Sequence, residues 1–178
     1  MKQIILKSRL IDTKLGSMIA IADDAGLYLL EFSDCRGLER EMECLKKRLT
    51  ADIISGTTRI IKKIEKELMD YFSGKKYQFE TPLVLSGSAF QKNVWNALQK
   101  IPPGETRSYL EIANTIKKPT AFRAVANANG ANQHAIIIPC HRVINSNGDI
   151  GGYAGGISRK QWLIEHEIKK RERSRPRK

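Results

Sequence analysis

The stretch from Tyr109 to Val143 reads YLEIANTIKKPTAFRAVANANGANQHAIIIPCHRV, and it decides how the second half of the chain folds. It begins with a predicted short helix, Tyr109–Thr115, and a basic turn, Ile116–Thr120. A second predicted helix, Ala121–Asn129, is ended by Gly130. Two short helices joined by a turn are typical of a helix-turn-helix, whose second helix normally approaches a DNA groove.

The second helix has an unusual surface for a DNA-reading helix. It consists mainly of Ala and Asn and carries one basic residue, Arg123. A helix that reads base edges in the major groove usually presents several long polar side chains. A small, smooth helix instead favours close approach to the backbone or minor groove, with Arg123 able to enter the base stack. Two helices joined by a turn also occur in proteins that bind no DNA, and the pattern alone leaves that alternative open.

A cysteine beside a histidine closes the stretch. The apolar run Ala135–Ile138 predicts a short buried strand, and Pro139, Cys140, His141 and Arg142 follow it directly. Positive charge and a proton acceptor close to a cysteine favour the thiolate, which is the nucleophilic form. The alternative is an unreactive cysteine packed at the end of a core strand, since buried cysteines of that kind are common.

Positive charge is concentrated in the second half of the chain, whose 178 residues together carry a net charge of +12. Residues 1–85 hold 15 Lys and Arg against 13 Asp and Glu, whereas residues 86–178 hold 16 against 6. The segment 169–178 has seven bases and one acid, and we expect a basic, disordered tail there. The second half is the half expected to meet a polyanion, although a solubilising basic face would give the same charge.

Composition indicates a globular protein of a reducing compartment. Hydrophobic residues make up 41% of the chain, and no segment approaches the roughly 20 apolar residues of a membrane span. The first residues are too charged for a signal peptide. Cys35, Cys44 and Cys140 make an odd number without disulfide-framework spacing. We therefore expect a cytoplasmic protein with no membrane association, and nucleoid association if the source is prokaryotic.

The first half reads as strands followed by helices. Three β-rich runs predict strands, at residues 3–7, 17–22 and 26–32. The turn signal Asp23–Gly26 predicts a hairpin between the last two. Helical periodicity covers residues 38–49 and 60–72. An extended connector around Pro82 marks the predicted boundary, which gives one domain at residues 1–85 and a second at residues 86–168.

Capping boxes predict three helix starts in the second half. A Ser followed three residues later by Gln or Glu satisfies exposed backbone amides at the first turn of a helix. Each of the three boxes precedes an apolar periodic segment: Ser88 with Gln91, Ser108 with Glu111, and Ser158 with Gln161.

Several residues occur in a fixed order around the cysteine. The order is Tyr109, Arg123, Asn132, Pro139–Val143, Gly152–Gly156 and Trp162–Glu167. Over residues 86–167 the chain resembles the O6-alkylguanine-DNA alkyltransferases, also called methylated-DNA–protein-cysteine methyltransferases. The resemblance implies an α+β fold, with a small ribonuclease H-like α/β domain followed by a winged helix-turn-helix-like domain. It also implies a monomeric DNA-repair enzyme that needs no cofactor and binds double-stranded DNA containing O6-alkylguanine.

The resemblance implies a reaction as well. The Cys140 thiolate would take the alkyl group from guanine O6 in one stoichiometric turnover, after minor-groove binding and flipping of the base. His141 would act as the base with Glu167 holding its imidazole, while Tyr109 donates to the leaving guanine. Adjacent residues of an extended segment point opposite ways, so a water would bridge Cys140 and His141. Asn132 would order the turn that carries the cysteine.

The resemblance implies further contacts with the substrate and the DNA. Arg123 would fill the space left by the flipped base. Four residues would contact DNA: Tyr109, Arg123, Ala124 and Ala128. Four would form the guanine pocket: Cys140, Val143, Tyr153 and Ala154. Arg142 would either lower the thiol pKa or pair with a carboxylate, and we favour the pairing.

Two features depart from the family pattern. Some members carry a serine where Ala154 stands, so a side-chain contribution there is lost, whereas the backbone amide is retained. Some members bind zinc in the first domain. Here that half offers only Cys35 and Cys44 and has no histidine before His134, so four nitrogen or sulfur ligands cannot be assembled. We expect no metal.

Three other functions are alternatives. A lesion-recognition protein without transfer activity would bind the same base, but the presence of Cys140, His141 and Glu167 argues against it. A winged-helix regulator that senses electrophiles would need a helix able to read sequence, and the Ala/Asn helix argues against that. A Cys-His hydrolase lacks an evident oxyanion-hole motif.

Overall fold

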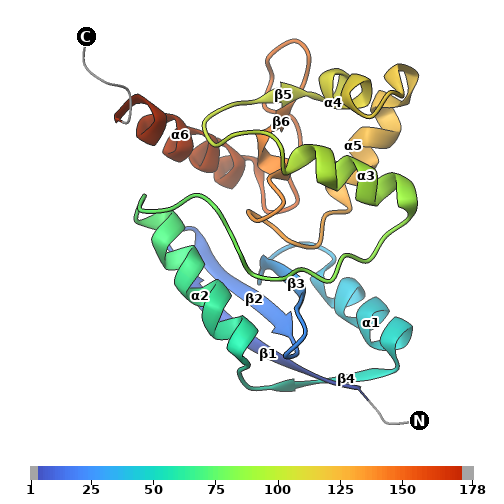
Figure 1. The fold of residues 1–178 in the computed structure, drawn as a ribbon, viewed down its shortest axis with the longest axis vertical. Helices are drawn as coiled ribbons and strands as arrows, with labels where there is room; N and C mark the ends of the chain where they lie inside the picture. Colours follow the sequence, from blue (N-terminus) through green and yellow to red (C-terminus); the bar gives the residue numbers. More distant parts are fainter. Residues whose placement is uncertain (1–3, 174–178) are drawn as a thin grey trace. The chain divides into compact units, whose positions relative to one another are not determined.

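The computed structural model describes residues 4–173 and separates the chain into two units, Met1–Leu85 and Ser86–Lys178 (Figure 1). A sheet and helices both occur, so the expected mixture of α and β structure is confirmed. In the described part of the chain, no helix combines the length and the apolar character needed to cross a membrane.

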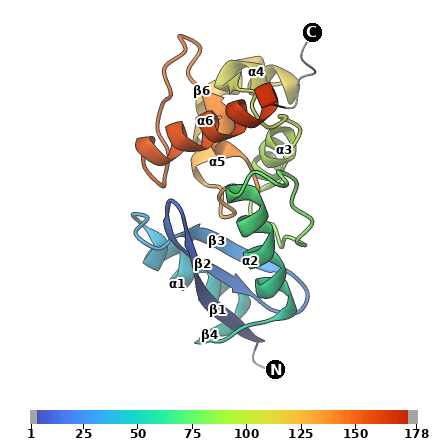
Figure 2. The same ribbon diagram turned by 90° about the vertical axis from the view of Figure 1, so that its left-hand side faces the viewer.

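A four-stranded sheet in the order β3-β2-β1-β4 forms the first unit (Figure 2). Its strands are β1 (Ile4–Thr13), β2 (Gly16–Ala22), β3 (Leu27–Phe32) and β4 (Ala51–Ser55). The hairpin predicted between β2 and β3 is confirmed, and the Asp23 carboxylate closes its turn by accepting from the Ala25 and Gly26 amides. Sequence patterns missed β4, which pairs in parallel with β1.

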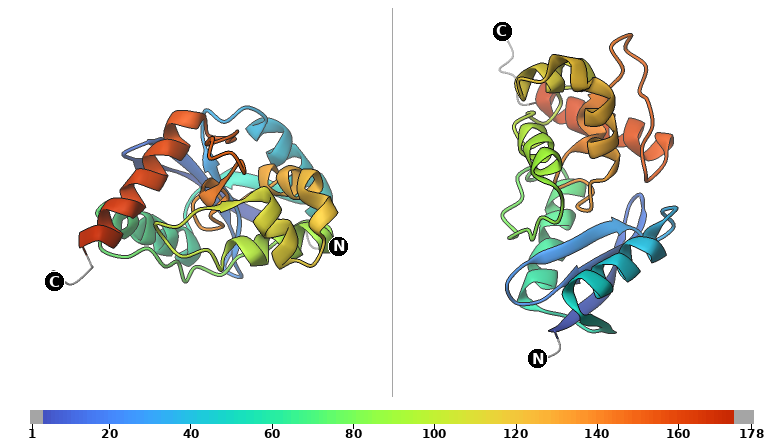
Figure 3. Two further views of the ribbon diagram at one scale, coloured as in Figure 1. Left: turned by 90° about the horizontal axis from the view of Figure 1, so that it is seen from above. Right: turned by 90° about the vertical axis from the view of Figure 1, so that its right-hand side faces the viewer.

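Helices α1 (Leu38–Leu49) and α2 (Arg59–Phe72) lie on opposite faces of this sheet (Figures 1 and 3). Leu45 of α1 packs in a core cluster with Leu6, Ile21 and Leu29 of the strands. The Thr58 side chain begins α2 by accepting from the Ile61 amide. Both predicted helices are therefore confirmed to within one residue.

The second unit contains four α-helices among its described residues, joined by short strands and 3-10 turns. In chain order they are α3 (Ala89–Leu98), β5 (Arg107–Ser108), α4 (Tyr109–Thr115), η1 (Pro119–Ala121), α5 (Phe122–Gly130), η2 (Cys140–Arg142), β6 (Val143–Ile144) and α6 (Ile157–Arg173). Helices α3, α4 and α5 contact one another, and β5 pairs in parallel with β6. The Trp95 indole of α3 donates to the Ala128 carbonyl of α5 at 2.8 Å, which fixes these two helices together.

Two of the three predicted capping boxes are confirmed. Ser88 and Ser108 each accept from the backbone three residues later, and Gln91 and Glu111 return the contact. The third prediction is wrong, because α6 begins at Ile157 and Ser158 therefore lies inside the helix. The Gly156 amide closes a turn by donating to the Tyr153 carbonyl, and Gly156 has a φ of 95°, so the helix begins directly after this turn.

Two further expectations are corrected. The apolar run Ala135–Ile138 is a turn rather than a strand, because the Ile138 amide bonds back to the His134 carbonyl. The first five residues of the basic segment, 169–173, are helical rather than disordered, and Arg171 contacts Glu105 and the Gly104 carbonyl. Residues 174–178 lie outside the described residues.

Candidate active site

Cys140 begins the 3-10 turn η2 and is buried, with 7% of its surface exposed. Its amide donates to the Ile138 carbonyl at 2.7 Å, and its own carbonyl accepts from the Val143 amide. The turn continues into β6, whose pairing with β5 brings Tyr109, the first residue of α4, to the same part of the unit. The cysteine is thus held by a tight turn and not by an extended strand.

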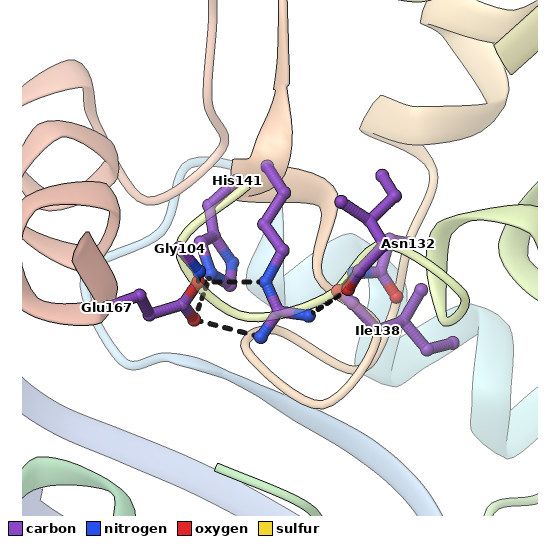
Figure 4. Close-up of polar contacts among 7 residues, drawn as sticks. Gly104, Asn132, Ile138, His141 and Glu167 are labelled. Atoms are coloured by element: carbon purple, nitrogen blue, oxygen red, sulfur yellow. Dashed lines mark hydrogen bonds and ion pairs between the residues drawn. The ribbon is translucent and has the colours of Figure 1, made fainter. Parts of the chain in front are cut away.

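Asn132 organises the turn in front of the cysteine (Figure 4). Its Oδ1 accepts from the His134 amide at 2.9 Å, and its Nδ2 donates to the Ile138 carbonyl at 2.9 Å. The same Nδ2 lies 3.2 Å from the Cys140 Sγ atom. Its position therefore supports the predicted ordering role and adds a contact that the sequence did not suggest, a donor aimed at the sulfur.

The turn ordered by Asn132 is also strained. Ile136 has a φ of 73°, a left-handed conformation that β-branched residues rarely adopt. Its side chain is almost completely buried, so packing offsets the backbone cost. Such strain persists only where the surroundings fix the conformation, and here it lies in the turn that leads to the cysteine.

A buried polar cluster lies next to the cysteine and centres on Glu167 of α6 (Figure 4). His141 Nε2 is 2.9 Å from Glu167 Oε1. Arg142 donates to both carboxylate oxygens at 2.9 Å and to the Ile101 carbonyl at 2.6 Å. Gly104 donates its amide to Oε2 at 3.2 Å. The expected structural pairing of Arg142 with a carboxylate is confirmed.

The cluster fixes the charge on each partner. Burial alone would raise the pKa of Glu167, but His141 and Arg142 outweigh burial and hold that pKa well below its usual range. Burial lowers the pKa of His141, and the charges of Arg142 and Lys160 add to this effect against the opposing influence of Glu167. The histidine is therefore neutral beside an ionised carboxylate.

The hydrogen bonds also define the histidine tautomer. An ionised carboxylate only accepts, so the His141 Nε2 atom carries the proton. The Nδ1 atom is buried and has no hydrogen-bond partner among the described residues, so its lone pair is free. A neutral imidazole oriented in this way by a carboxylate can act as a general base.

Two other ionisable groups respond to Cys140. Burial raises the pKa of Tyr109, and the negative charge of a Cys140 thiolate raises it further. Burial lowers the pKa of Lys160 to about 8, and the thiolate opposes that change. Because its pKa is raised, the Tyr109 phenol stays protonated at neutral pH and can donate a proton.

Lys160 and Asn129 are neighbours of the site that sequence reasoning missed. Lys160 is completely buried, and its Nζ donates to the Gly152 carbonyl at 3.1 Å. Asn129 Nδ2 lies 3.4 Å from the Cys140 carbonyl. Lysine is normally exposed, and Asn129 is one of several polar residues in α5, so the sequence around neither residue predicts a place near the cysteine.

The residues expected to contact DNA separate into two groups. Arg123 and Ala124 are exposed on α5. Ala128 is 2% exposed and faces inward with Val125, so its predicted contact with DNA is wrong. On a helix, residues three apart share a face, and this face packs against α3.

The expected pocket residues differ in exposure. Val143 is buried, Tyr153 is half-buried and Ala154 is exposed. The last two belong to the segment between β6 and α6, which Lys160 holds through the Gly152 carbonyl. Within residues 4–173, no three His, Cys, Asp or Glu side chains gather where they could bind a metal ion.

The chain is similar to DNA-repair methyltransferases over nearly its whole length. A family model described as the DNA-binding domain of 6-O-methylguanine DNA methyltransferase matches residues 89–169. A methylated-DNA–protein-cysteine methyltransferase from Methanosarcina barkeri is 42% identical, over 89% of this chain and 94% of the relative. An inducible one from Bacillus subtilis is 41% identical, over 76% of this chain and 75% of the relative.

Solved structures agree with the sequence relatives. The O6-methylguanine methyltransferase of Mycobacterium tuberculosis has a TM-score of 0.79 and 39% identity, covering 93% of this chain and 94% of that one. A structure of the Mycobacterium tuberculosis protein OGT in complex with DNA has a TM-score of 0.78 and 37% identity, covering 94% of both chains.

Proposed function

The chain belongs to the methylated-DNA–protein-cysteine methyltransferases, a family of DNA-repair enzymes, and we propose that it transfers an alkyl group from guanine O6 in double-stranded DNA to Cys140. The observation that carries this proposal is the buried His141–Glu167 pair beside Cys140. The alkyl group ends as a thioether, so each molecule acts once and needs no cofactor.

The proton path follows from the tautomer of His141. The free Nδ1 atom takes the thiol proton from Cys140 through a bridging water, while Glu167 stabilises the imidazolium that forms. The sulfur then bonds to the alkyl carbon, and the bond from that carbon to guanine O6 breaks. Asn132 Nδ2 supports the thiolate as a donor 3.2 Å from the sulfur.

The leaving guanine needs a proton as its oxygen becomes negative. Tyr109 supplies this proton, since its raised pKa keeps the phenol protonated until charge develops on the base. The Cys140 and Val143 carbonyls accept from the guanine amine, while Tyr153 and the Ala154 amide form the pocket wall. The long 3.4 Å contact from Asn129 to the Cys140 carbonyl is the one that the guanine amine displaces.

We infer that the second unit is a winged helix-turn-helix that approaches the minor groove through α5. Exposed Ala124 lets the backbone come close, and exposed Arg123 enters the space left by the flipped base. Tyr109, at the start of α4, helps to rotate the phosphate. The first unit, with helices on both faces of a mixed sheet, is assigned the ribonuclease H-like fold.

We propose that the protein acts as a monomer. We keep the cytoplasm, and the nucleoid of a prokaryote, as the proposed location. A lesion-recognition protein without transfer activity is the competing function, and it predicts tight binding to the damaged duplex without a covalent product.

The test is to incubate the protein with duplex DNA that carries a labelled methyl group on guanine O6. Label should accumulate on the protein to one equivalent and then stop, because the product is not turned over. Cys140→Ala should abolish labelling, whereas Cys44→Ala, which changes an exposed cysteine of the first unit, should not. Label retained by Cys140→Ala, or binding without any label, would contradict the proposal.

The wedge role of Arg123 has a separate test. Arg123→Ala should slow repair of the duplex by about tenfold or more, since extrusion of a base costs a few kcal/mol. Its reaction with free O6-benzylguanine should be unchanged, because that substrate is already unstacked. Arg48→Ala, an exposed arginine of α1, is the matched control. Equal losses on both substrates would refute the role.

A further inference from the structure

Phe122 is an unusual residue for the exposed surface of α5. It begins the helix and is 44% exposed, although large apolar side chains normally pack inside. The other exposed residues of α5 are Arg123, Ala124, Asn127 and Gly130, so Phe122 is the one large apolar side chain on that surface. Packing within the second unit therefore leaves a large part of this side chain uncovered.

The aromatic ring is coupled to its neighbour Arg123. The guanidinium carbon of Arg123 lies 5.6 Å from the centroid of the Phe122 ring, within the range of a cation–π contact. Among the described residues, no carboxylate pairs with Arg123. The ring is thus the partner that restricts the guanidinium, and it does so without neutralising its charge.

The surroundings of this pair are basic and lack acidic groups in the sequence. Lys117 and Lys118 are exposed in the turn before α5, and the chain has no acidic residue between Glu111 and Asp149. A cationic surface that presents one exposed aromatic ring is the combination that binds unstacked nucleic acid bases. The lysines attract phosphates, and the ring offers a stacking face that accepts any base.

We propose that Phe122 and Arg123 form a two-residue wedge, in which Arg123 fills the space of the extruded nucleotide and the Phe122 ring stacks on a base exposed beside it. This inference rests on the proposed function and names a DNA contact within it. Apolar side chains that insert at base steps kink the duplex and lower the cost of extruding a base. Stacking is independent of sequence, as a lesion scanner requires.

The experiment measures unstacking and repair separately. A duplex carries O6-methylguanine with 2-aminopurine beside it, and the fluorescence of 2-aminopurine rises when it loses its stacking neighbour. Fluorescence is followed in the Cys140→Ala background, so that chemistry is absent, and repair rates are measured with Cys140 intact. The variants are Phe122→Ala, Phe122→Leu and Phe122→Trp, with Met69→Ala of α2, 66% exposed, as the control.

We expect Phe122→Ala and Phe122→Leu to lose much of the fluorescence rise and about tenfold in the rate of duplex repair, since both lack a ring. Phe122→Trp and Met69→Ala should match the unmodified protein. All four should react normally with free O6-benzylguanine, which shows that the site is intact.

Three results would overturn the wedge. The first is repair of the duplex at the normal rate by Phe122→Ala. The second is full function in Phe122→Leu, which would mean that volume and not stacking matters, as at a contact with another protein. The third is an equal loss with the free base, which would make Phe122 a structural residue. Failure of the proposed function looks different, because the protein with Phe122 intact would then transfer no label.

Discussion

The two units of the chain differ in net charge and in the kind of side chain that they bury. The first, residues 1–85, is close to charge balance and has regular strands and helices around an apolar cluster that includes Leu6, Ile21, Leu29 and Leu45. The second, residues 86–178, is strongly basic, has short elements and irregular segments, and buries four charged or ionisable side chains near Cys140: His141, Arg142, Lys160 and Glu167.

The difference reflects the unequal cost of burying apolar and charged side chains. Burial of an apolar side chain is favourable by itself, whereas burial of a charge is costly unless hydrogen bonds satisfy it. In the second unit, four polar contacts to the buried Glu167 carboxylate offset the cost of burying charge beside the cysteine. Both tryptophans, Trp95 and Trp162, belong to this unit, so tryptophan fluorescence reports on its unfolding alone.

The largest expected effect comes from Glu167→Ala. It leaves Arg142 buried without its carboxylate, which should lower the free energy of unfolding of the second unit by about 4 kcal/mol. Urea unfolding followed by tryptophan fluorescence measures the loss. If the free energy of unfolding changed by less than about 1 kcal/mol, the polar cluster around Glu167 would not be important for the stability of this unit.

Leu29→Ala is the counterpart in the first unit. It creates a cavity in an apolar cluster and should cost about 3 kcal/mol. Circular dichroism should show an earlier transition, while the tryptophan transition and the rate of alkyl transfer stay unchanged. If the tryptophan transition moved equally, the two units would unfold together and the comparison between them would fail.

Acidification should move the two units in opposite directions, by less than either substitution. From pH 7.5 to 5 the second unit loses stability, because the lowered pKa of His141 means that the unfolded state binds the proton more readily below about pH 6.5. The first unit has no histidine, and burial raises the pKa of Glu41 there, so protonation as pH falls toward about 4.5 favours its folded state.

Urea titrations at the two pH values, followed by fluorescence and by circular dichroism, test this contrast. The lowered pKa values of the exposed, paired Glu43 and Glu80 act on the first unit only below about pH 4.5, outside the range used. If acidification lowered the free energy of unfolding of both units, the opposite effects assigned to His141 and Glu41 would be contradicted.

Helix caps should give the smallest effects. Ser88→Ala removes a complete capping box from the second unit and should cost about 1 kcal/mol, as should Thr58→Ala at the start of α2 in the first. Ser158→Ala lies inside α6 and should change stability by less than about 0.5 kcal/mol. Tryptophan fluorescence measures the free energy of unfolding of both variants of the second unit. If Ser88→Ala and Ser158→Ala lowered it by similar amounts, the loss at Ser88 would not come from its capping box.

The first unit was largely predictable from local patterns. Asp23–Gly26 signals a turn, and the spacing of apolar residues in α1 and α2 is helical, so the hairpin and both helices could be placed. Strand β4 could not, since Ala51–Ser55 is short and becomes a strand only through its partner β1. The composition of five residues does not indicate that they will pair with a strand far away in the sequence.

The residues of the proposed site could be named from the sequence, but their conformation could not. Ala135–Ile138 has the composition of a strand, but the side-chain bonds of Asn132 and the bond from the Ile138 amide to the His134 carbonyl hold it as a turn. Lys160 was missed because lysine is usually exposed, and burial depends on the whole unit. Local sequence therefore indicates which groups are candidates for the reaction, whereas long-range contacts decide how they are held.

The fork of Arg142 has a consequence for the order of events in folding. It joins the Ile101 carbonyl, 41 residues earlier, to Glu167, 25 residues later. Closing loops of that size is slow relative to forming the helices they connect. We therefore expect the Glu167 carboxylate that orients His141 to reach its place late in folding. If Cys140 accepts the alkyl group as proposed, the rate at which a refolding chain gains this activity should report the rate at which these contacts form.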